Sequence, residues 1–299
     1  MADLQDIGAF VAVAKHGGFR GAARMTGNSA SQLSEAVRRL EASLGVRLLS
    51  RTTRSVATTD AGQRLLEQLM PALGAVESAL DVVNGFRDRP AGRLRLNVPL
   101  SVSKLILPRI IPPFIAVYPD ICLEIIVDDS FVDLLRSGCD AGVRYEEHME
   151  LDMVAIPIGP RRQRFALAAS PDYLRQHGMP KRPEDLLKHT CLRGRFSSGA
   201  MPDWEFEHKG KKVVIKPAGP LIVSLGAGAD LKVDAALAGS GLVYLFEDWL
   251  KPYMERGELE PVLERWWPSF SGPSLYYPGR RYLPAPLRAF VDFIPAMRW

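Results

Sequence analysis

Residues 93–299 alternate between short apolar runs that favour strands and segments whose apolar residues recur with helical spacing. The runs predicted as strands are RLRLNVP (93–99), ICLEIIVDD (121–129), DAGVRY (140–145), MVAIPIG (153–159) and SLYYPGR (274–280). Helices are predicted at 103–119, 131–138 and 285–294, and a second strand–helix unit begins at 164 and continues through 221–250. This order is typical of an α/β fold with mostly parallel sheets, in which ligands bind at the carboxyl ends of the strands.

The first 62 residues show a different pattern, in which three short helices precede a hairpin. The helices are expected at about 4–15, 20–25 and 31–44, because HGG and TGNS interrupt the helical periodicity between them. Either Ser29 or Ser31 is placed to cap the third helix. The apolar face of the first helix holds Leu4, Ile7, Val11 and Ala14.

The third helix has two contrasting sides. Its apolar side holds Leu33, Ala36, Val37, Leu40 and Leu44. Its other side presents Ser31, Ser34, Glu35 and Arg38, with Gln32 and Arg39 at the edge. Two helices joined by a Gly-containing turn, the second carrying such a polar side, suit insertion into a DNA major groove, where short polar groups contact base edges and arginines reach phosphates or guanine. For this helix considered alone, a solvated surface is the alternative.

A basic hairpin is predicted after the third helix. RTTRSVAT (51–58) is expected to form a small wing beside the helices, with Arg51 and Arg54 placed for phosphate contact. From Arg20 to Arg54 there are seven arginines against two glutamates, a local charge of +5, whereas the whole chain carries +4. A local basic excess of this kind is typical of a nucleic-acid-binding surface.

A long amphipathic helix is predicted next, with its N-terminus capped at Thr59 and Asp60 and its end near Asn84. Its apolar residues follow one another in steps of three and four, which defines a heptad seam. The seam consists of Leu66, Leu69, Leu73, Val76, Leu80 and Val83. Pro71 predicts a bend, and the polar, Gly- and Pro-containing stretch 84–92 predicts a hinge. The seam packs either on its own domain or on another helix.

Composition and missing motifs exclude several classes of protein. Apolar residues make up 47% and charged residues 24%, and no apolar run reaches the roughly 18 residues of a membrane span. Asp3 and Asp6 stand where an export signal carries positive charge, and three scattered cysteines fit a reducing cytoplasm. A G-x-S-x-G turn, metal-ligand spacing of His or Cys, and a phosphate-binding loop are missing. We therefore expect a cytoplasmic protein without catalytic site, metal or cofactor.

The stretch from Gly17 to Gly62 resembles, without gaps, the winged helix-turn-helix of LysR-type transcriptional regulators. The shared features are a Gly-Phe turn, an Ala-Ala helix, a Ser-rich helix ending in RRLE, then LGVRL, RTTR and a Thr-acid-Ala-Gly linker start. The chain departs from the family pattern at Arg20 and Gly21, since the family has Ser or Thr after the Gly-Phe turn. A helix cap is thereby lost, and we expect Arg20 to contact phosphate instead.

The resemblance covers essentially the whole chain. NVPLSVSKLILP (97–108), GSGLVYL (239–245) and GELEPVL (257–263) are similar to parts of the family's two-lobed effector domain, which has the fold of type 2 periplasmic binding proteins. Overall, the sequence is most similar to the regulators grouped around the neisserial contact-regulated type. The implied domains are 1–58 (DNA binding), 59–89 (dimerisation helix and hinge) and 90–299 (effector binding), with lobe one at 93–160 and 266–299 and lobe two at 161–265.

The resemblance implies a sequence-specific regulator whose DNA binding or promoter activation responds to a small molecule bound between the lobes. Its expected partners are double-stranded DNA, the effector, copies of itself in a dimer or dimer of dimers, and RNA polymerase. The expected DNA contacts are Arg20, Ser29, Ser31, Gln32, Ser34, Glu35, Arg38, Arg51 and Arg54. The expected effector contacts are Ser101, Ser103, Asp129, Ser130, Arg144, Arg195, Phe196 and Ser224.

Three points stay open in the sequence. Either of the serines at 101 and 103 can instead cap its own helix, and the charge of the effector is undecided because arginines favour an anion whereas Asp128 and Asp129 oppose it. A two-lobed solute-binding protein without a regulatory role is the alternative function. The missing export signal and the winged N-terminal segment argue against it.

Overall fold

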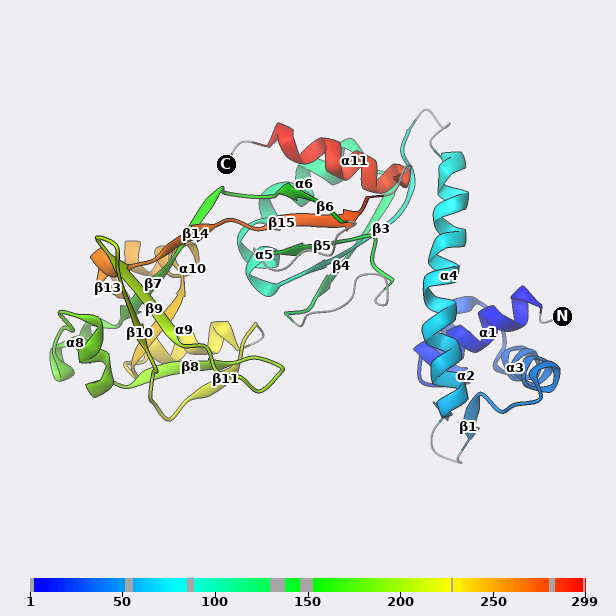
Figure 1. Ribbon diagram of the computed structural model, residues 1–299, viewed down its shortest axis with the longest axis horizontal. Helices are drawn as coiled ribbons and strands as arrows, with labels where there is room; N and C mark the ends of the chain where they lie inside the picture. The colour runs from blue at the N-terminus through cyan, green and yellow to red at the C-terminus, as the bar shows by residue number, and fades with distance from the viewer. Residues whose placement is uncertain are drawn as a thin grey trace. The chain divides into compact units, whose positions relative to one another are not determined.

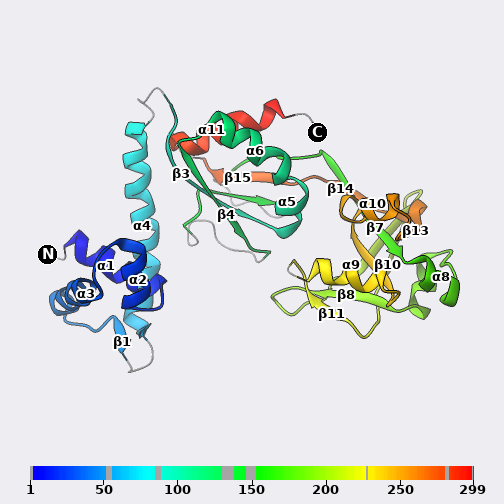
Figure 2. The same ribbon diagram turned by 180° about the vertical axis from the view of Figure 1, so that it is seen from behind.

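The computed structural model describes residues 3–51, 56–84, 89–129, 138–145, 153–226, 228–279, 283–297 and 299. The chain divides into two compact units, the first built on Met1–Asp81 and the second on Val82–Leu134 and Cys139–Trp299. Figures 1 and 2 show these units from opposite sides. None of the helices within the described ranges has the length and apolarity needed to cross a membrane.

The first unit is a winged helix-turn-helix with a long helix attached. Three short helices, α1 (Leu4–Lys15), α2 (Phe19–Thr26) and α3 (Ala30–Leu44), precede the antiparallel pair β1 (Leu49–Arg51) and β2 (Val56–Thr58). The long helix α4 (Asp60–Asn84) follows, and Figure 1 shows the short helices gathered against its N-terminal half. The predicted fold of the N-terminal segment is confirmed.

The core of this unit forms where the short helices and the wing meet, and it includes Phe10, Val13 and Leu40. Of the predicted apolar face of α1, Ile7, Val11 and Ala14 pack in or against this core. Leu4 is exposed, whereas Phe10 and Val13, which the prediction left out, are fully buried. Apolar residues occur around most of α1, so their spacing does not single out one face, and the bulky Phe10 occupies the core. Leu44, expected on the packed side of α3, is 46% exposed at the last position of that helix.

The second unit begins with lobe one, a five-stranded sheet in the order β4-β3-β5-β15-β6. β3, β4 and β5 are parallel, whereas β15 runs antiparallel to β5 and β6. Phe114 of α6 packs edge-on against Phe290 of α11, so these two helices lie side by side (Figure 2). The elements are β3 (Gly92–Val98), α5 (Leu100–Leu105), α6 (Leu107–Val117), β4 (Ile121–Val127), β5 (Ala141–Arg144), β6 (Met153–Pro157), β15 (Ser274–Pro278) and α11 (Ala285–Phe293).

Lobe two contains a sheet in the order β11-β8-β12-β7-β13, with β14 also paired to β7, and a separate hairpin of β9 and β10. Its strands are β7 (Arg162–Ala169), β8 (Cys191–Arg195), β9 (Trp204–His208), β10 (Lys211–Ile215), β11 (Ile222–Ser224), β12 (Leu242–Phe246), β13 (Glu260–Val262) and β14 (Ser269–Ser271). Its helices are α8 (Pro171–His177), α9 (Ala229–Leu237) and α10 (Glu247–Glu255), with 3-10 turns at Pro183–Lys188 and Glu264–Trp266.

Three details of the predicted effector domain are corrected. Both sheets are mixed and not mostly parallel. The chain crosses from lobe one to lobe two along 158–161 and returns along 272–273. The strands that follow these crossings, β7 and β15, run antiparallel to their neighbours. The return crossing follows β14, which pairs with β7 in lobe two, and therefore lies later than residue 266. The helix predicted at 103–119 is two helices that begin at Leu100 and Leu107. The helix predicted at 131–138 falls almost wholly outside the described residues.

Candidate nucleic-acid interface and ligand cavity

Helix α3 begins with a capping box. Ser29 is the N-cap: its Oγ accepts a hydrogen bond from the Gln32 N–H at 3.2 Å, and Gln32 Oε1 accepts one from the Ser29 N–H at 2.8 Å. Ser31 Oγ lies 3.0 Å from Ser29 Oγ. Ser29, and not Ser31, therefore caps the helix. Because the Gln32 side chain belongs to the same cap, the N-terminal turn of α3 is held in a defined geometry.

The remaining polar residues of this face are accessible. Ser31, Glu35 and Arg38 are exposed, and Ser34 is half-buried. Arg38 donates from Nη2 to Glu35 Oε1 at 2.8 Å and from Nε to Oε2 at 3.1 Å. The hydrogen bond from Arg38 lowers the pKa of the Glu35 carboxyl. Exposed pairs of this kind are weak, so Arg38 can exchange Glu35 for a phosphate or a base.

Two other charged residues of α3 have structural partners. Arg39 forms a two-point ion pair with the buried Asp6 of α1, at 2.6 Å between Nη2 and Oδ1 and 3.2 Å between Nε and Oδ2. Glu41 Oε1 accepts hydrogen bonds from the N–H groups of Leu48 and Leu49, at 2.8 and 3.0 Å. Arg39 and Glu41 therefore fix α3 against α1 and the wing, and they orient the exposed face.

At the start of α2, Gly18 is the N-cap and supplies no side-chain hydrogen bond. The predicted loss of this cap is confirmed, and Arg20 is exposed in the first turn of the helix. The wing brings Arg51 to the end of β1. The side chain of Arg51 and the whole of Arg54 lie outside the described residues.

The long helix α4 begins in contact with the residues that lead into β1. Thr59 Oγ1 accepts a hydrogen bond from the Gly62 N–H at 3.0 Å and donates one to the Arg47 carbonyl at 2.8 Å. A Cβ on Gly62 would meet the Leu48 carbonyl oxygen at 2.0 Å, so only glycine fits there.

The predicted heptad seam of α4 has two parts. Leu66, Leu69 and Leu73 are half-buried against the core of the first unit. Val76, one heptad step further, is 54% exposed. The side chains of Leu80 and Val83 are not among those that the structure describes. The first half of the seam thus packs on its own domain, and at Val76 the seam is open to a partner.

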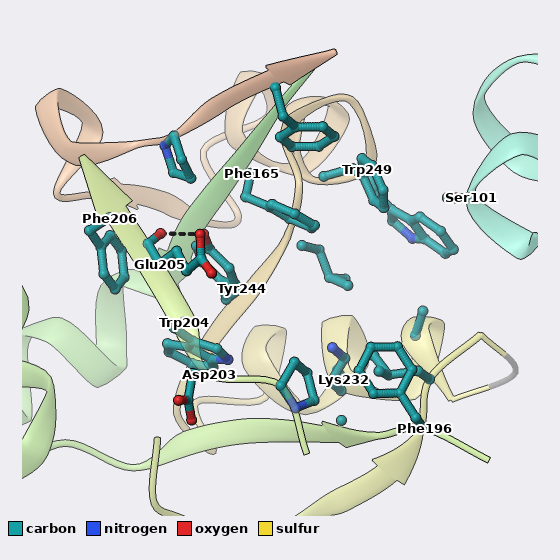
Figure 3. Close-up of a pocket in the computed structure, with 18 of the residues that line it drawn as sticks. Ser101, Phe165, Phe196, Asp203, Trp204, Glu205, Phe206, Lys232, Tyr244 and Trp249 are labelled. Atoms are coloured by element: carbon teal, nitrogen blue, oxygen red, sulfur yellow. Dashed lines mark hydrogen bonds between the residues drawn. The ribbon is translucent and has the colours of Figure 1, made fainter. Parts of the chain in front are cut away.

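In the second unit, a cavity of about 950 Å³ lies mainly in lobe two, between the β9–β10 hairpin, the strands β7 and β12 and the helix α9. Its wall is rich in aromatic rings (Figure 3). The Phe165 ring lies 5.1 Å from Tyr244, 4.8 Å from Phe246 and 4.9 Å from Phe270, measured between centroids. Trp204 stacks on Tyr244 at 5.2 Å. This volume is within the range that accommodates a small organic molecule.

Polar groups of different accessibility border the cavity. Lys232 of α9 is only 3% exposed, and Figure 3 shows its side chain directed into the cavity. Burial lowers the pKa of its amino group to about 8. The Tyr244 hydroxyl donates to the Glu205 carbonyl at 2.6 Å. Asp203, Glu205 and Lys212 are exposed at the rim.

The expected effector contacts of lobe one divide into two groups. Ser101, which is 8% exposed, and Asp129 line the cavity. The Asp129 carboxylate accepts a hydrogen bond from the Leu100 N–H at 3.2 Å, and partial desolvation raises its pKa. Ser103 and Arg144 are not among the lining residues, and Arg144 donates to the Asn97 side chain and to the Val143 carbonyl.

The alternative that either serine caps its own helix is wrong. Pro99 is the N-cap of α5, and Ser101 and Ser103 lie inside the helix. Ser101 Oγ instead lies 3.3 Å from the Tyr145 hydroxyl. Because the Asp129 carboxylate already occupies the first N–H of α5, an anionic effector would be repelled from this helix end.

In lobe two, Phe196 lines the cavity as expected. Arg195 and Ser224 are opposite each other in the parallel pair of β8 and β11 and are not among the lining residues. Ser130 lies outside the described residues. Sequence reasoning missed the aromatic wall and Lys232. For Lys232 a signal exists, because the spacing of Ala229, Val233 and Ala236 places it on the apolar side of α9.

Cysteine chemistry does not contribute to this cavity. Cys139 and Cys191 are buried, and burial raises the pKa of the Cys191 thiol to about 11. Cys122 is exposed. Within the described part of the chain, no group of three or more His, Cys, Asp or Glu residues is arranged to hold a metal ion.

Comparison with known families matches both units. Residues 4–63 match the bacterial regulatory helix-turn-helix protein, lysR family, and residues 87–298 match the LysR substrate binding domain. The chain is 39% identical to the uncharacterized HTH-type transcriptional regulator YcaN of Escherichia coli K12, over 98% of this chain and 94% of that protein. It is 35% identical to the HTH-type transcriptional regulator PgrR of the same organism, over 97% and 96%.

Solved structures show the same architecture. The full-length structure of AphB, a virulence activator from Vibrio cholerae, has a TM-score of 0.67 at 26% identity, with 99% of this chain and 100% of that chain covered. CrgA, a LysR-type transcriptional regulator from Neisseria meningitidis, has a TM-score of 0.58 at 26% identity, with 98% of both chains covered. The similarity to the neisserial type of regulator is thus found in structure as well as in sequence.

A winged helix-turn-helix with an exposed polar helix face, joined by a long helix to a two-lobed domain with a ligand-sized cavity, defines an effector-responsive DNA-binding regulator. This chain belongs to the LysR family of transcriptional regulators, as both family matches show. The family consists of DNA-binding regulators and not enzymes. The alternative of a solute-binding protein without a regulatory role is excluded by the DNA-binding domain.

Proposed function

We propose that the exposed face of α3 recognises the operator in the major groove. Ser31, Ser34, Glu35 and Arg38 supply the groups that contact base edges, because they share the accessible side of the helix. Ser29 and Gln32 hold the first turn of α3 through the capping box and present it to the DNA. Arg20, Arg51 and Arg54 are assigned to phosphates flanking the groove.

The regulator acts as a dimer, or a dimer of dimers, paired through α4. Two half-sites need two recognition helices, and α4 connects the DNA-binding domain to the effector domain. The exposed Val76, with Leu80 and Val83 further along the seam, forms the partner contact, and Leu66, Leu69 and Leu73 position α4 on the DNA-binding domain. The functional parts are then 1–58, 59–89 and 90–299.

A small effector in the cavity modulates this activity. The cavity is lined by Leu100, Ser101 and Asp129 from lobe one and by a larger set of residues from lobe two, so an occupant contacts both lobes. A ligand that prefers one arrangement of the lobes shifts the population toward it. The protein works in the cytoplasm, where promoter DNA and RNA polymerase are available to it.

The observation that carries this proposal is the capped α3 with its exposed serine and arginine face. The test is a mobility-shift titration with the DNA upstream of the gene. If Arg38 contacts a base, Arg38→Ala is expected to lose ~1–3 kcal/mol of binding free energy. If it contacts phosphate, the loss should be the same for all DNA sequences, and the affinity should depend less steeply on salt concentration. Combined changes at Gln32, Ser34 and Arg38 should abolish specific binding.

The matched control is Arg175→Ala, because Arg175 also forms an exposed ion pair with an acidic residue three positions away, on α8 of the effector domain. It should leave DNA affinity unchanged. Wild-type affinity in the combined α3 variant would remove this helix from the interface.

A further inference from the structure

Lys232 is a buried cation for which the described residues supply no partner. It lies on the side of α9 that also holds the buried Ala229, Val233 and Ala236. Its backbone N–H bonds to the Gly228 carbonyl at 3.2 Å, but among the described residues no acceptor bonds its ammonium group. Two other buried polar residues do have partners, since Asp6 bonds Arg39 and Asn97 bonds Arg144. Burying an unpaired ammonium is costly, so this lysine is retained at the expense of stability.

Aromatic rings line the cavity around Lys232. The cavity into which it projects is bordered by the rings of Phe165, Phe196, Tyr244 and Trp249. In Figure 3 the side chain of Lys232 enters from below, while Phe165 and Tyr244 lie above it. Rings in such a wall pack well against the face or edge of another flat group.

No carboxylate in the described part of the chain neutralises this charge. Asp129, Asp203, Glu205 and Glu207 border the cavity, but all four are exposed. Desolvation alone accounts for the lowered pKa of Lys232, without any contribution from a neighbouring acid. Asp230, two residues earlier on α9, already bonds Lys104 and the Trp249 indole N–H.

We infer that Lys232 binds the carboxylate of a small effector whose flat apolar body lies against the aromatic wall of lobe two. This inference rests on the proposed function, in which the domain binds an effector, and it names the chemical class of that effector. A single buried ammonium matches a single negative charge, and a charge-assisted hydrogen bond in an apolar site is among the stronger polar contacts. The neutral amide of the same acid cannot supply this charge.

The anion site is therefore in lobe two and not at the N-terminus of α5, where Asp129 holds the Leu100 N–H. The occupant reaches lobe one through neutral contacts with Leu100 and Ser101. This division explains how one molecule contacts both lobes while its charge stays away from Asp129.

The test uses full-length protein and three acids of graded size, benzoate, 3-phenylpropionate and indole-3-acetate, each beside its neutral amide, in isothermal titration calorimetry. At least one acid should bind, and its amide should bind at least tenfold more weakly, which is about 1.4 kcal/mol. Lys232→Met should abolish binding of the acid. Lys251→Met, which removes an exposed lysine of α10, should bind the acid as the wild type does.

A second measurement separates a ligand-binding lysine from a structural one. Without ligand, Lys232→Met should unfold at a higher temperature than the wild type, because the buried charge is removed and the apolar stem is kept. A lower unfolding temperature, equal binding of acid and amide, unchanged acid binding in Lys232→Met, or no binding of any acid at about 10 mM would each overturn the inference.

Binding of the upstream DNA by the wild type and by Lys232→Met is measured in parallel. Both proteins should bind it. Failure of both to bind the DNA, with acid binding intact in the wild type, would refute the proposed function and leave the assignment of Lys232 standing.

Discussion

Arg38, Arg39 and Lys232 have three different roles that follow from their partners. Arg39 bonds the buried Asp6 and holds two helices together, whereas Arg38 bonds the exposed Glu35 and can exchange it for DNA. Lys232 has no partner among the described residues and projects into a cavity. The helix faces of these residues can be predicted from spacing. Their partners cannot, because Asp6 and the aromatic wall come from distant parts of the sequence.

The buried lysine predicts a pH dependence of stability in the ligand-free protein. Burial lowers the pKa of the Lys232 ammonium from 10.5 to about 8. Between these values the unfolded chain keeps a proton that the folded protein has released, so the free energy of unfolding rises with pH across this window. The full effect is roughly 3 kcal/mol.

Urea denaturation of the wild type and Lys232→Met checks this prediction. The variant should be the more stable protein at about pH 7, and its advantage should shrink as the pH approaches about 10. An advantage that stays constant over that range would contradict an uncompensated charge at Lys232.

Most helices and strands could be predicted from the spacing of apolar residues and from turn residues. The other elements depend on contacts between distant parts of the chain. The helix predicted at 103–119 is divided because Pro108 lacks an N–H and clashes with the carbonyl four residues earlier. The β9–β10 hairpin was not predicted, although its apolar residues alternate and Lys209-Gly210 forms a turn with φ of 49° and 78°. The direction of β7 and β15 depends on the crossings between lobes, which no local pattern encodes.

Helix α4 carries the prediction for dimerisation. Val76 is exposed, whereas Leu73 packs on the DNA-binding core, so Val76→Asp places a carboxylate in the proposed partner contact without disturbing the fold of the single chain. We expect monomers by light scattering at micromolar concentration, unchanged helical content by circular dichroism, and weakened DNA binding.

Val117→Asp is the control, because Val117 is 57% exposed on α6 of the effector domain. It should remain dimeric. A Val76→Asp variant that is as dimeric as this control would show that α4 pairs elsewhere or not at all.

For the whole molecule, the order of DNA-binding domain, long helix and two-lobed domain could be predicted from the sequence, because the resemblance covers essentially the full length. The proposed ligand site could be predicted only in part. Ser101, Asp129 and Phe196 line the cavity, whereas most of its wall comes from separate segments of lobe two, among them β7, β9 and β12, which meet only in the folded lobe. Lys104 of α5 also bonds Asp230 of α9, so the helix that carries Lys232 is tied directly to lobe one. Occupation of the cavity can therefore bias the arrangement of the lobes.

Nuclease footprinting with full-length protein tests most directly that this chain is a sequence-specific, dimeric regulator. The two DNA samples are the region upstream of the gene and a shuffled sequence of the same composition. We predict two protected half-sites on the upstream DNA alone, with centres about 10 base pairs apart or a multiple of that spacing. Equal protection of both sequences, or protection of neither, would contradict the account.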